Sequence, residues 1–214
     1  MARDIVLYDY WRSSASYRVR IALNLLGLEA EIRPVNLLTG AHLDADYLAL
    51  NPQGLLPALI VDGQTLTQSL AIIEYLHATQ PGSRLLPETV DGQYRVRQLA
   101  HAIAMEIHPV CNLGVVRHVA DLAGGGDETK AAWMRHFIGK GLTAFETLLD
   151  GSEGPFCHGT TPTMADCCLI PQLYNADRWG VDVSGFPGIR RAAGACGELD
   201  AFRNAHPDKI GPPA

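Results

Sequence analysis

The sequence predicts a chain of two parts, an α/β part with the order βαβαββα followed by an all-helical part. Short apolar runs alternate with helically spaced segments over the first 80 residues, as an α/β arrangement requires. The pair Asp62-Gly63 stands between two strand-like runs and is typical of a hairpin turn. After residue 80 only helical spacing is found. We therefore predict an α/β domain over residues 1–80, a linker containing proline and glycine over 81–87, and a helical domain over 88–214.

Each strand and helix predicted in the first part is supported by its local sequence. The run Ile5–Tyr8 is apolar and predicts a buried strand, and the helically spaced segment after it ends at Gly27, a residue that favours helix C-termini. Further strands are predicted at residues 30–36, 58–61 and 64–66, and further helices at 45–50 and 70–78. Together these elements give the βαβαββα order.

The second part carries helical spacing throughout. Thr163 and Asp166 have the Thr-x-x-acid spacing of a capping box, so we expect them to start a helix and to serve structure only. The other predicted helices cover residues 93–122, with a break at 108–109, residues 129–149 and residues 186–202. The Pro- and Gly-rich residues 206–214 are predicted to form a loose tail.

Composition excludes several classes of protein. The 214 residues are 47% hydrophobic and 19% charged, and the net charge of −6 indicates no basic surface for nucleic acid. No apolar run approaches the ~20 residues that span a bilayer. The first residues enter a predicted strand at once, which leaves no room for a signal peptide, so we expect a cytoplasmic protein. Composition thus gives no sign of a nucleic-acid or membrane partner.

The five cysteines do not form a recognisable framework. Their number is odd, their spacing is irregular, and no Cys-x-x-Cys pair occurs, so neither a disulfide framework nor a zinc site is expected. Cys167 and Cys168 lie in an apolar helical run and are interpreted as buried, inert thiols. The His and acidic residues also lack metal-ligand spacing, so no metal is predicted.

The stretch between the first strand and the first helix is the strongest functional signal. Ser13, Ser14 and Ser16 stand where backbone N–H groups lack intrahelical partners and the helix dipole is positive. They could be ordinary helix caps, because serine is a preferred N-cap. Arg12 precedes them and further arginines follow, which favours an anionic ligand such as a thiolate, phosphate or carboxylate.

A second unusual position is Pro57, which stands directly before a predicted strand where a proline removes a ladder donor. A cis peptide at Leu56-Pro57 would turn the Leu56 backbone outward, free to pair with an extended peptide. Only a few per cent of X-Pro bonds are cis, so the trans form stays open from sequence alone.

Three segments of the sequence resemble the zeta class of glutathione transferases. They are Ser13–Leu23, which is similar to the class signature Ser-Ser-Cys-x-x-Arg-x-Arg-Ile-Ala-Leu, and the segments Asn51–Pro57 and Gln68–Leu76. The resemblance implies the glutathione transferase fold, with a thioredoxin-like first domain, a helical second domain, glutathione as coenzyme and a homodimer. One departure is Ala15, which stands where the family has a cysteine, so no thiol of the chain is expected to be essential.

The resemblance divides the glutathione site into parts. The cysteinyl backbone would pair with Leu56 beside a cis-Pro57, and the γ-glutamyl carboxylate would lie at Gln68 and Ser69, which could otherwise be an ordinary helix start. The glycyl end is assigned to His42, with a solvated loop histidine as the alternative. The sulfur is assigned to the pair Ser13 and Ser14, with Ser13 as the closer hydroxyl and the reverse order left open.

Substrate carboxylates are assigned to arginines. Arg12 fits this role because its planar fork pairs bidentately with a carboxylate, and Arg178 is the matching candidate in the helical part. The alternative for Arg178 is an ion pair with Asp177 or Asp182.

Four further residues complete the assignments. His108 and Asn112 are one turn apart near the Pro109 break and could both serve the coenzyme or substrate site, unless His108 only caps the broken helix. Arg18 and Arg20 lie deeper in the first helix and are interpreted as structural, in salt bridges.

The activity that the resemblance implies is glutathione-dependent cis–trans isomerisation of a conjugated double bond, with maleylacetoacetate as substrate. Maleylpyruvate is the alternative substrate, and general glutathione conjugation is the alternative reaction. Gly114 follows Asn112 and offers no cation to a shorter diacid, which favours the longer substrate. A non-catalytic module for protein association is the alternative from another class, although the serines and the Gln68-Ser69 pair are present here.

Overall fold

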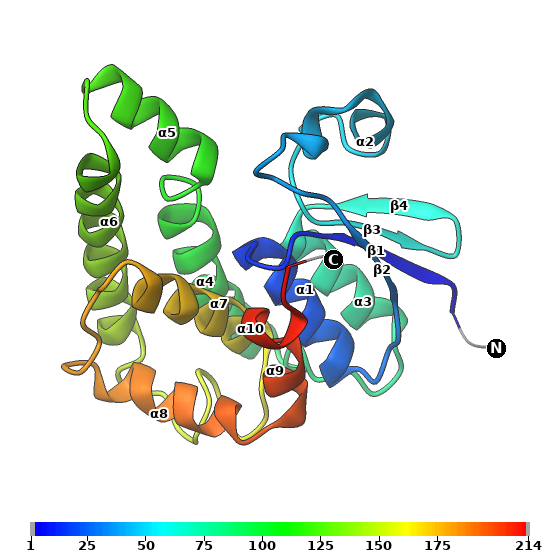
Figure 1. The fold of residues 1–214 in the computed structure, drawn as a ribbon. Coiled ribbons are helices and arrows are strands. Elements are labelled where there is room, and N and C mark those ends of the chain that lie inside the picture. The colour runs from blue at the N-terminus through cyan, green and yellow to red at the C-terminus, as the bar shows by residue number, and fades with distance from the viewer. Residues whose placement is uncertain (1–2, 213–214) are drawn as a thin grey trace. The chain divides into compact units, whose positions relative to one another are not determined.

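The computed structural model describes residues 3–212, and they form two compact units. One unit combines the chain up to Leu85 with the residues from Gly197 onward, and the other is Leu86–Cys196 (Figure 1). The order of α/β elements followed by helices agrees with the predicted fold class. The grouping of the last residues differs from the predicted helical domain 88–214, because they pack with the first unit.

A four-stranded sheet forms the centre of the first unit. Its strands are β1 (Ile5–Asp9), β2 (Glu31–Pro34), β3 (Ala58–Val61) and β4 (Gln64–Thr67), in the spatial order β2-β1-β3-β4. Strand β1 runs parallel to β2 and antiparallel to β3, so Leu7 lies opposite Ile32 on one side and Leu59 on the other. The hairpin β3–β4 turns at Asp62-Gly63, where both residues have positive φ, as the turn preferred by hairpins requires.

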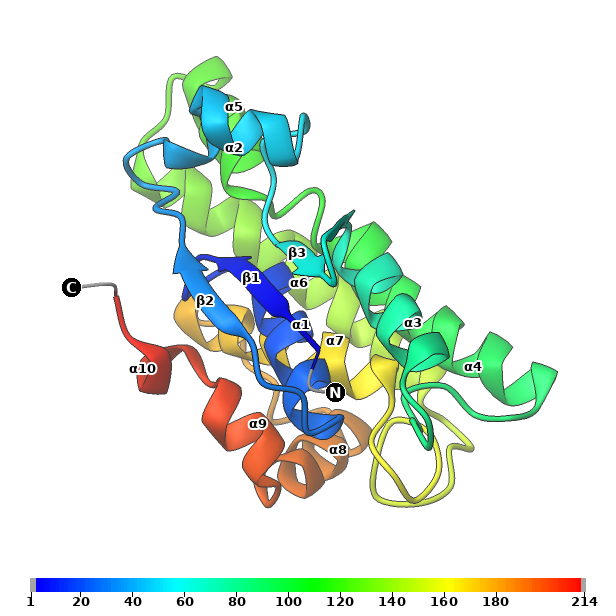
Figure 2. The same ribbon diagram turned by 90° about the vertical axis from the view of Figure 1, so that its right-hand side faces the viewer.

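Helices cover both faces of the sheet. Helices α1 (Ser14–Leu25) and α3 (Ser69–Thr79) pack side by side (Figures 1 and 2). The short helices η1 (Ala41–Leu43) and α2 (Ala45–Leu50) lie between β2 and β3 along the chain. Tyr47 of α2 contacts Tyr8, which points to the opposite face of β1 from Leu7, so α2 closes a second small core.

The C-terminal residues differ from their prediction. The expected helix over 186–202 is divided into α8 (Pro187–Gly197) and α9 (Asp200–Ala205), and the expected tail contains α10 (Pro207–Ile210), while residues 213–214 lie outside the described residues. Helix α9 packs against α1, where Asn24 Nδ2 donates to the carbonyl of Ala201 at 2.9 Å. Helix α10, in the segment predicted as a loose tail, packs against α9, and the His206 ring before it contacts the Tyr17 ring of α1.

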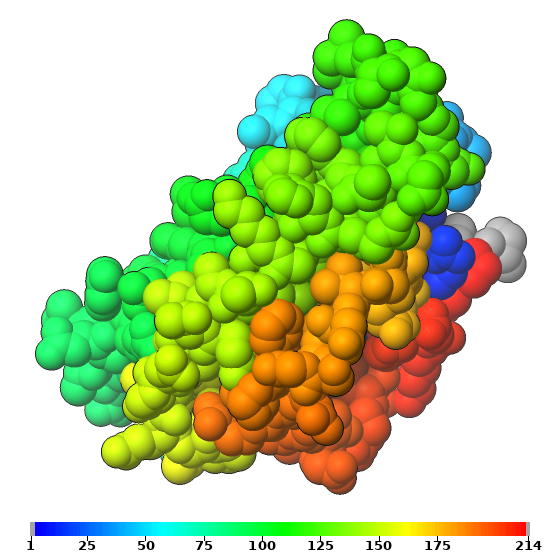
Figure 3. All heavy atoms as spheres, turned by 90° about the vertical axis from the view of Figure 1, so that its left-hand side faces the viewer, coloured from blue at the N-terminus to red at the C-terminus, as the bar shows by residue number. Residues whose placement is uncertain are grey.

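The second unit contains the other helices, namely α4 (Val90–His101), the π-helical turn η2 (Ala102–Ile107), α5 (Leu113–Leu122), α6 (Asp127–Leu148), α7 (Met164–Arg178) and α8. The predicted helix 93–122 is interrupted by η2 and by residues 108–112, close to the expected break. Glu146 of α6 accepts hydrogen bonds from the N–H groups of Gly188 and Ile189 and so caps α8. Figure 3 shows the surface that these two helices form.

The capping box at the start of α7 is confirmed. The Thr163 N–H and hydroxyl both donate to Asp166 Oδ2, and the Cys157 N–H donates to Asp166 Oδ1 at 2.8 Å. Burial raises the pKa of Asp166, and these hydrogen bonds oppose the rise. Asp166 therefore holds the loop before α7 against the helix and has a structural role, as predicted.

Candidate functional site

The loop after β1 is closed by two short-range hydrogen bonds. The Ser13 N–H donates to the Tyr10 carbonyl at 2.7 Å, and Ser13 Oγ accepts from the Ser16 N–H at 3.2 Å. Ser13 is therefore the N-cap of α1, so the capping interpretation holds for this serine. A hydroxyl that accepts one hydrogen bond still carries its own proton, which Ser13 can donate to an anion.

The first turn of α1 offers further donors. Within residues 3–212, the backbone N–H groups of Ser14 and Ala15 have no hydrogen-bond acceptor. The dipole of α1 adds positive potential at the same place. Arg12 stands beside them, exposed to solvent, with its guanidinium stacked 4.0 Å from the Trp11 ring. Ser13 and Ser14 are half-buried, so this group of donors and cations can hold a negatively charged atom from solution.

The loop before β3 presents a free backbone. The Leu56–Pro57 peptide is cis, the form that the resemblance implied and that the sequence alone left open. The Leu55 carbonyl accepts hydrogen bonds from Tyr47 Oη and Asn51 Nδ2, both at 2.7 Å. In the part of the chain that the structure describes, the N–H and carbonyl of Leu56 have no such partner. Leu56 can therefore pair with an added extended peptide.

The start of α3 is a second group of donors. Gln68 adopts φ 67° and ψ 109°, an unfavourable conformation for a residue with a side chain, and its Nε2 donates to Gln53 Oε1 at 2.8 Å. Its side chain makes no cap hydrogen bond, so the ordinary N-cap alternative is not found. The Ser69 and Leu70 N–H groups have no acceptor among the described residues, and they favour a carboxylate.

An arginine joins the two helix starts. Arg18, in the second turn of α1, donates from Nη1 to Ser69 Oγ at 3.2 Å and so links α1 to the start of α3 within the first unit. From the sequence Arg18 is interpreted as structural, and this contact was not predicted, since its partner is 51 residues away along the chain. Ser69 accepts from Arg18 and keeps its hydroxyl proton for a ligand.

His42 lies in η1, half-buried, and its carbonyl approaches Gly54 in the loop that leads to Leu56. Gly54 has φ +60°, and a Cβ there would approach the His42 carbonyl to 3.2 Å and Leu43 to 3.0 Å. The structure therefore places His42 near the Leu56 loop. Its assignment to the glycyl end stays a prediction.

The predicted residues of the second unit occupy the region after η2. His108 ends η2, where its N–H donates to the Ile103 carbonyl. Asn112 is the N-cap of α5, with Oδ1 accepting from the Gly114 N–H at 2.9 Å. His108 thus stands at the C-cap of the broken helix, as its capping alternative expected. Asn112 caps α5 and keeps its amide NH2 group as a donor.

Arg178 ends α7 and is exposed, with its guanidinium 5.9 Å from the Tyr174 ring. The alternative ion pairs are not found between residues 3 and 212, since Asp182 instead accepts hydrogen bonds from the Ser184 N–H and hydroxyl. The guanidinium therefore has its donors available for a carboxylate.

No thiol of the chain is suited to act as a nucleophile. All five cysteines are free and buried. Burial raises the pKa of Cys111 to about 11 and raises the pKa values of Cys157 and Cys167 well above their ordinary range. Within residues 3–212, no group of three or more His, Cys, Asp or Glu side chains is placed to hold a metal ion. The chain's own thiols therefore do not supply a nucleophile at the start of α1.

Comparison with family models shows two matches. The glutathione S-transferase N-terminal domain matches residues 3–78, and the glutathione S-transferase C-terminal domain matches residues 130–195. None of the helices that the structure describes is long and apolar enough to cross a bilayer.

Comparison with known proteins agrees over nearly the whole chain. Maleylacetoacetate isomerase of Rhizobium meliloti strain 1021 is 56% identical over 99% of this chain and 100% of its own length. The holo structure of a maleyl pyruvate isomerase, a bacterial zeta-class glutathione S-transferase, has a TM-score of 0.92 at 44% identity, covering 95% of this chain and 97% of its own. Maleylacetoacetate isomerase of Anaeromyxobacter dehalogenans 2CP-1, with GSH in its active site, has a TM-score of 0.88 at 42% identity and covers 97% of each chain. The chain belongs to the glutathione S-transferase family, in its zeta class.

Proposed function

We propose that the protein is a glutathione-dependent cis–trans isomerase that converts maleylacetoacetate to fumarylacetoacetate. The observation that carries this proposal is the set of free donors at the start of α1, where Ser13 caps the helix and still holds a proton to donate. The protein's own thiols are buried, so the anion that suits these donors is an added thiolate. The activity named for relatives of 56% and 42% identity supports the same reaction.

The residues present fit glutathione as an extended anionic tripeptide. The unpaired backbone of Leu56 suits its cysteinyl residue, and the free amides of Ser69 and Leu70 suit its γ-glutamyl carboxylate. Ser13 and Ser14 would then hold the sulfur. Bound glutathione supplies a thiolate that adds reversibly to the substrate's cis double bond, which lets that bond rotate.

The role of the chain is to favour the thiolate and to hold the substrate. The Ser13 hydroxyl and the Ser14 and Ala15 amides donate toward the sulfur, and hydrogen bonds to a charged form lower its pKa. A helix N-terminus or a nearby cation lowers a thiol pKa from ~8.5 by one or more units, so that the thiolate forms near neutral pH.

Two arginines suit the substrate carboxylates. Arg12 lies next to the sulfur-binding serines, and its positive charge would stabilise negative charge that develops on the adjacent carbonyl group. Arg178 is exposed at the end of α7 and has no ion-pair partner among the described acidic residues. His108 and the Asn112 amide are proposed as further polar contacts.

Maleylpyruvate isomerisation is the second candidate, because a relative of that activity is 44% identical over nearly the same length. Gly114 lies in the first turn of α5 and is exposed, and it presents no cation to a shorter diacid. This favours maleylacetoacetate as the better substrate.

The deciding experiment measures kcat/KM for maleylacetoacetate, maleylpyruvate and a general electrophile, each with glutathione and with S-methylglutathione. We expect the highest kcat/KM with maleylacetoacetate, glutathione unchanged after turnover, and no turnover with the S-methyl derivative, which has no thiol. A higher kcat/KM with maleylpyruvate would reassign the substrate. Consumption of glutathione would indicate conjugation, and retention on immobilised glutathione without turnover would indicate a binding module.

We also infer that the protein is a cytoplasmic homodimer. Val90 and Tyr94 lie one turn apart on α4 and are 82% and 65% exposed, which supports an apolar contact between copies. Five free cysteines suit a reducing compartment. Sedimentation of the purified protein tests the dimer, and Tyr94→Glu should shift it toward monomer. Cell fractionation tests the compartment.

A further inference from the structure

The first unit contains a buried ion pair that the proposed chemistry does not use. Arg20 Nη1 donates to both carboxylate oxygens of Asp9, at 2.7 and 2.8 Å, and the two side chains are only 4% and 2% exposed. Burial raises the pKa of Asp9, and the adjacent guanidinium of Arg20 opposes the rise. Pairs of this kind contribute little net stability compared with apolar residues of similar size, so their presence calls for another explanation.

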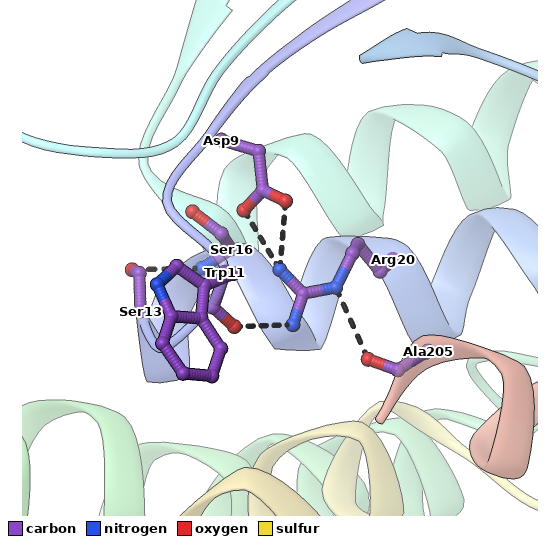
Figure 4. A network of polar contacts seen from close by, with 6 residues as sticks. All are labelled: Asp9, Trp11, Ser13, Ser16, Arg20 and Ala205. Carbon is purple, nitrogen blue, oxygen red and sulfur yellow. Dashed lines mark hydrogen bonds and ion pairs between the residues drawn. The ribbon is translucent and has the colours of Figure 1, made fainter. Parts of the chain in front are cut away.

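The remaining nitrogens of Arg20 bind two carbonyl groups that are far apart in the sequence. Nη2 donates to the Trp11 carbonyl at 3.0 Å, and Nε donates to the Ala205 carbonyl at 3.1 Å (Figure 4). Ala205 ends α9, where a helix dipole is negative and favours a cation. Arg20 thus joins the end of β1, the loop after it and the C-terminal helices.

Trp11 directly precedes Arg12, and its carbonyl accepts from Arg20. The carbonyl of the residue before it, Tyr10, accepts from the Ser13 N–H. The Tyr10 and Trp11 carbonyl groups, which lie in the loop before the sulfur-binding serines, are therefore fixed, the first by Ser13 within the loop and the second by Arg20 of α1. Any change in the Trp11 peptide would change the direction of the Ser13 hydroxyl and the Ser14 amide. Because Asp9 neutralises Arg20, the influence of Arg20 on the sulfur is geometric.

We propose that Arg20 is a positioning residue for the coenzyme thiolate, and that it couples the C-terminal segment at Ala205 to the loop that carries Ser13 and Ser14. This proposal rests on the proposed function, since it concerns the same sulfur. Lysine cannot replace arginine here, because a single ammonium group lacks the planar fork that reaches Asp9, Trp11 and Ala205 together.

Two variants test the role and separate it from folding. Arg20→Lys keeps the charge opposite Asp9, and the double variant Asp9→Leu/Arg20→Met replaces the pair with apolar side chains. We expect both to fold, to bind S-methylglutathione within twofold of the parent, and to lower kcat about tenfold. The thiolate pKa of bound glutathione, followed by ultraviolet absorbance against pH, should rise by about one unit, since a tenfold change in ionisation is one pKa unit.

The control is Arg33→Lys, which alters an exposed arginine paired with Glu31 on β2 and should leave the thiolate pKa unchanged. Folded Arg20 variants with the parental thiolate pKa and kcat would overturn the proposal. Failure of both variants to fold, by circular dichroism, would show that Arg20 serves stability, and would overturn it too. If the protein does not use glutathione as proposed, the parent itself will show no thiolate absorbance with glutathione, and if only the substrate is wrong, the parent will show the thiolate without isomerising maleylacetoacetate; both results differ from an unchanged Arg20 variant.

Discussion

The Ser16 N–H donates a hydrogen bond to Ser13 Oγ across 3.2 Å, so the oxygen that caps α1 is the same one that we propose to contact the coenzyme sulfur. Ser13→Ala should lose both roles. We expect a stability loss of about 1 kcal/mol from the missing cap, and a fall in kcat of about 10²-fold from the missing donor. Urea unfolding and steady-state kinetics measure the two effects.

Ser14→Ala is the matched comparison, because the Ser14 hydroxyl makes no cap hydrogen bond among the described residues. Its stability should stay within about 0.5 kcal/mol of the parent. A larger loss of kcat in Ser14→Ala than in Ser13→Ala would reverse the assignment of the closer hydroxyl, and activity in the variant lacking both hydroxyls would remove it.

Gln68→Gly should separate backbone strain from binding. Glycine adopts the φ of 67° seen here at low cost, so relief of strain should raise the free energy of unfolding by about 1 kcal/mol. The affinity for glutathione should fall about fivefold, as expected for one hydrogen bond lost. Calorimetric titration and chemical denaturation give both values. Gln68→Ala is the control, with weaker binding and no gain in stability; a stabilised alanine variant would contradict the strain argument.

Alkylating reagents should leave the isomerase active. All five thiols are buried, and with its pKa raised to about 11 Cys111 ionises far less at pH 8 than an exposed cysteine does. Iodoacetamide at pH 8 should therefore modify the cysteines of the native protein slowly. After unfolding it should modify all five cysteines, and mass spectrometry can count the labels in both cases. Rapid loss of activity with one label would point to an essential thiol and would contradict the prediction.

Arg178→Gln should raise KM for the diacid substrate about 10- to 100-fold, because hydrogen bonds to a charged group contribute roughly 1.5–3 kcal/mol. Arg178 is exposed, so stability should not change. Arg178→Lys should have an intermediate KM, since lysine keeps the positive charge but lacks the planar guanidinium that binds a carboxylate through two hydrogen bonds. Arg191→Gln, an exposed arginine of α8, is the control. Equal KM values for the Arg178 and Arg191 variants would exclude the proposed contact.

Two glycines of α6 give a matched test of packing behind η2. A Cβ on Gly141 would overlap the buried Ile107 side chain, whereas on Gly139 it would meet only Val181 at 3.9 Å. Gly141→Ala should lose about 1–3 kcal/mol of stability from overpacking, and Gly139→Ala should gain up to about 1 kcal/mol from helix propensity. Thermal unfolding of both variants measures whether stability falls or rises. Equal shifts in the unfolding temperature would show that η2 moves at Ile107 to make room for the added methyl group.

Local patterns predicted the elements that depend on neighbours in sequence. The apolar run at Ile5, the Asp62-Gly63 turn and the Thr163–Asp166 capping box each carry their own physical reason, and the structure contains all three. The cis peptide at Leu56-Pro57 was left open by the sequence, because proline at this position removes a donor in either form, and only the resemblance favoured cis.

Long-range contacts could not be predicted in this way. The bond from Arg18 to Ser69 and the one from Arg20 to Ala205 join residues that are 51 and 185 positions apart, and no spacing rule relates them. The prediction of a loose tail over 206–214 was wrong for its described part, because α10 packs against α9 and the His206 ring contacts the Tyr17 ring of α1. The π-helical turn η2 gave no distinct signal, since its residues keep an apolar pattern that fits an ordinary helix.

The packing of α9 on α1 has a consequence for synthesis on the ribosome. A nascent chain emerges N-terminus first, so the sheet and its helices are made early but stay incomplete until the codons for residues 200–205 have been translated. Residues 86–196 are synthesised before that moment. The first unit thus begins first and is finished last, and a premature stop codon just after Cys196 would damage the unit that is encoded mainly at the opposite end of the gene.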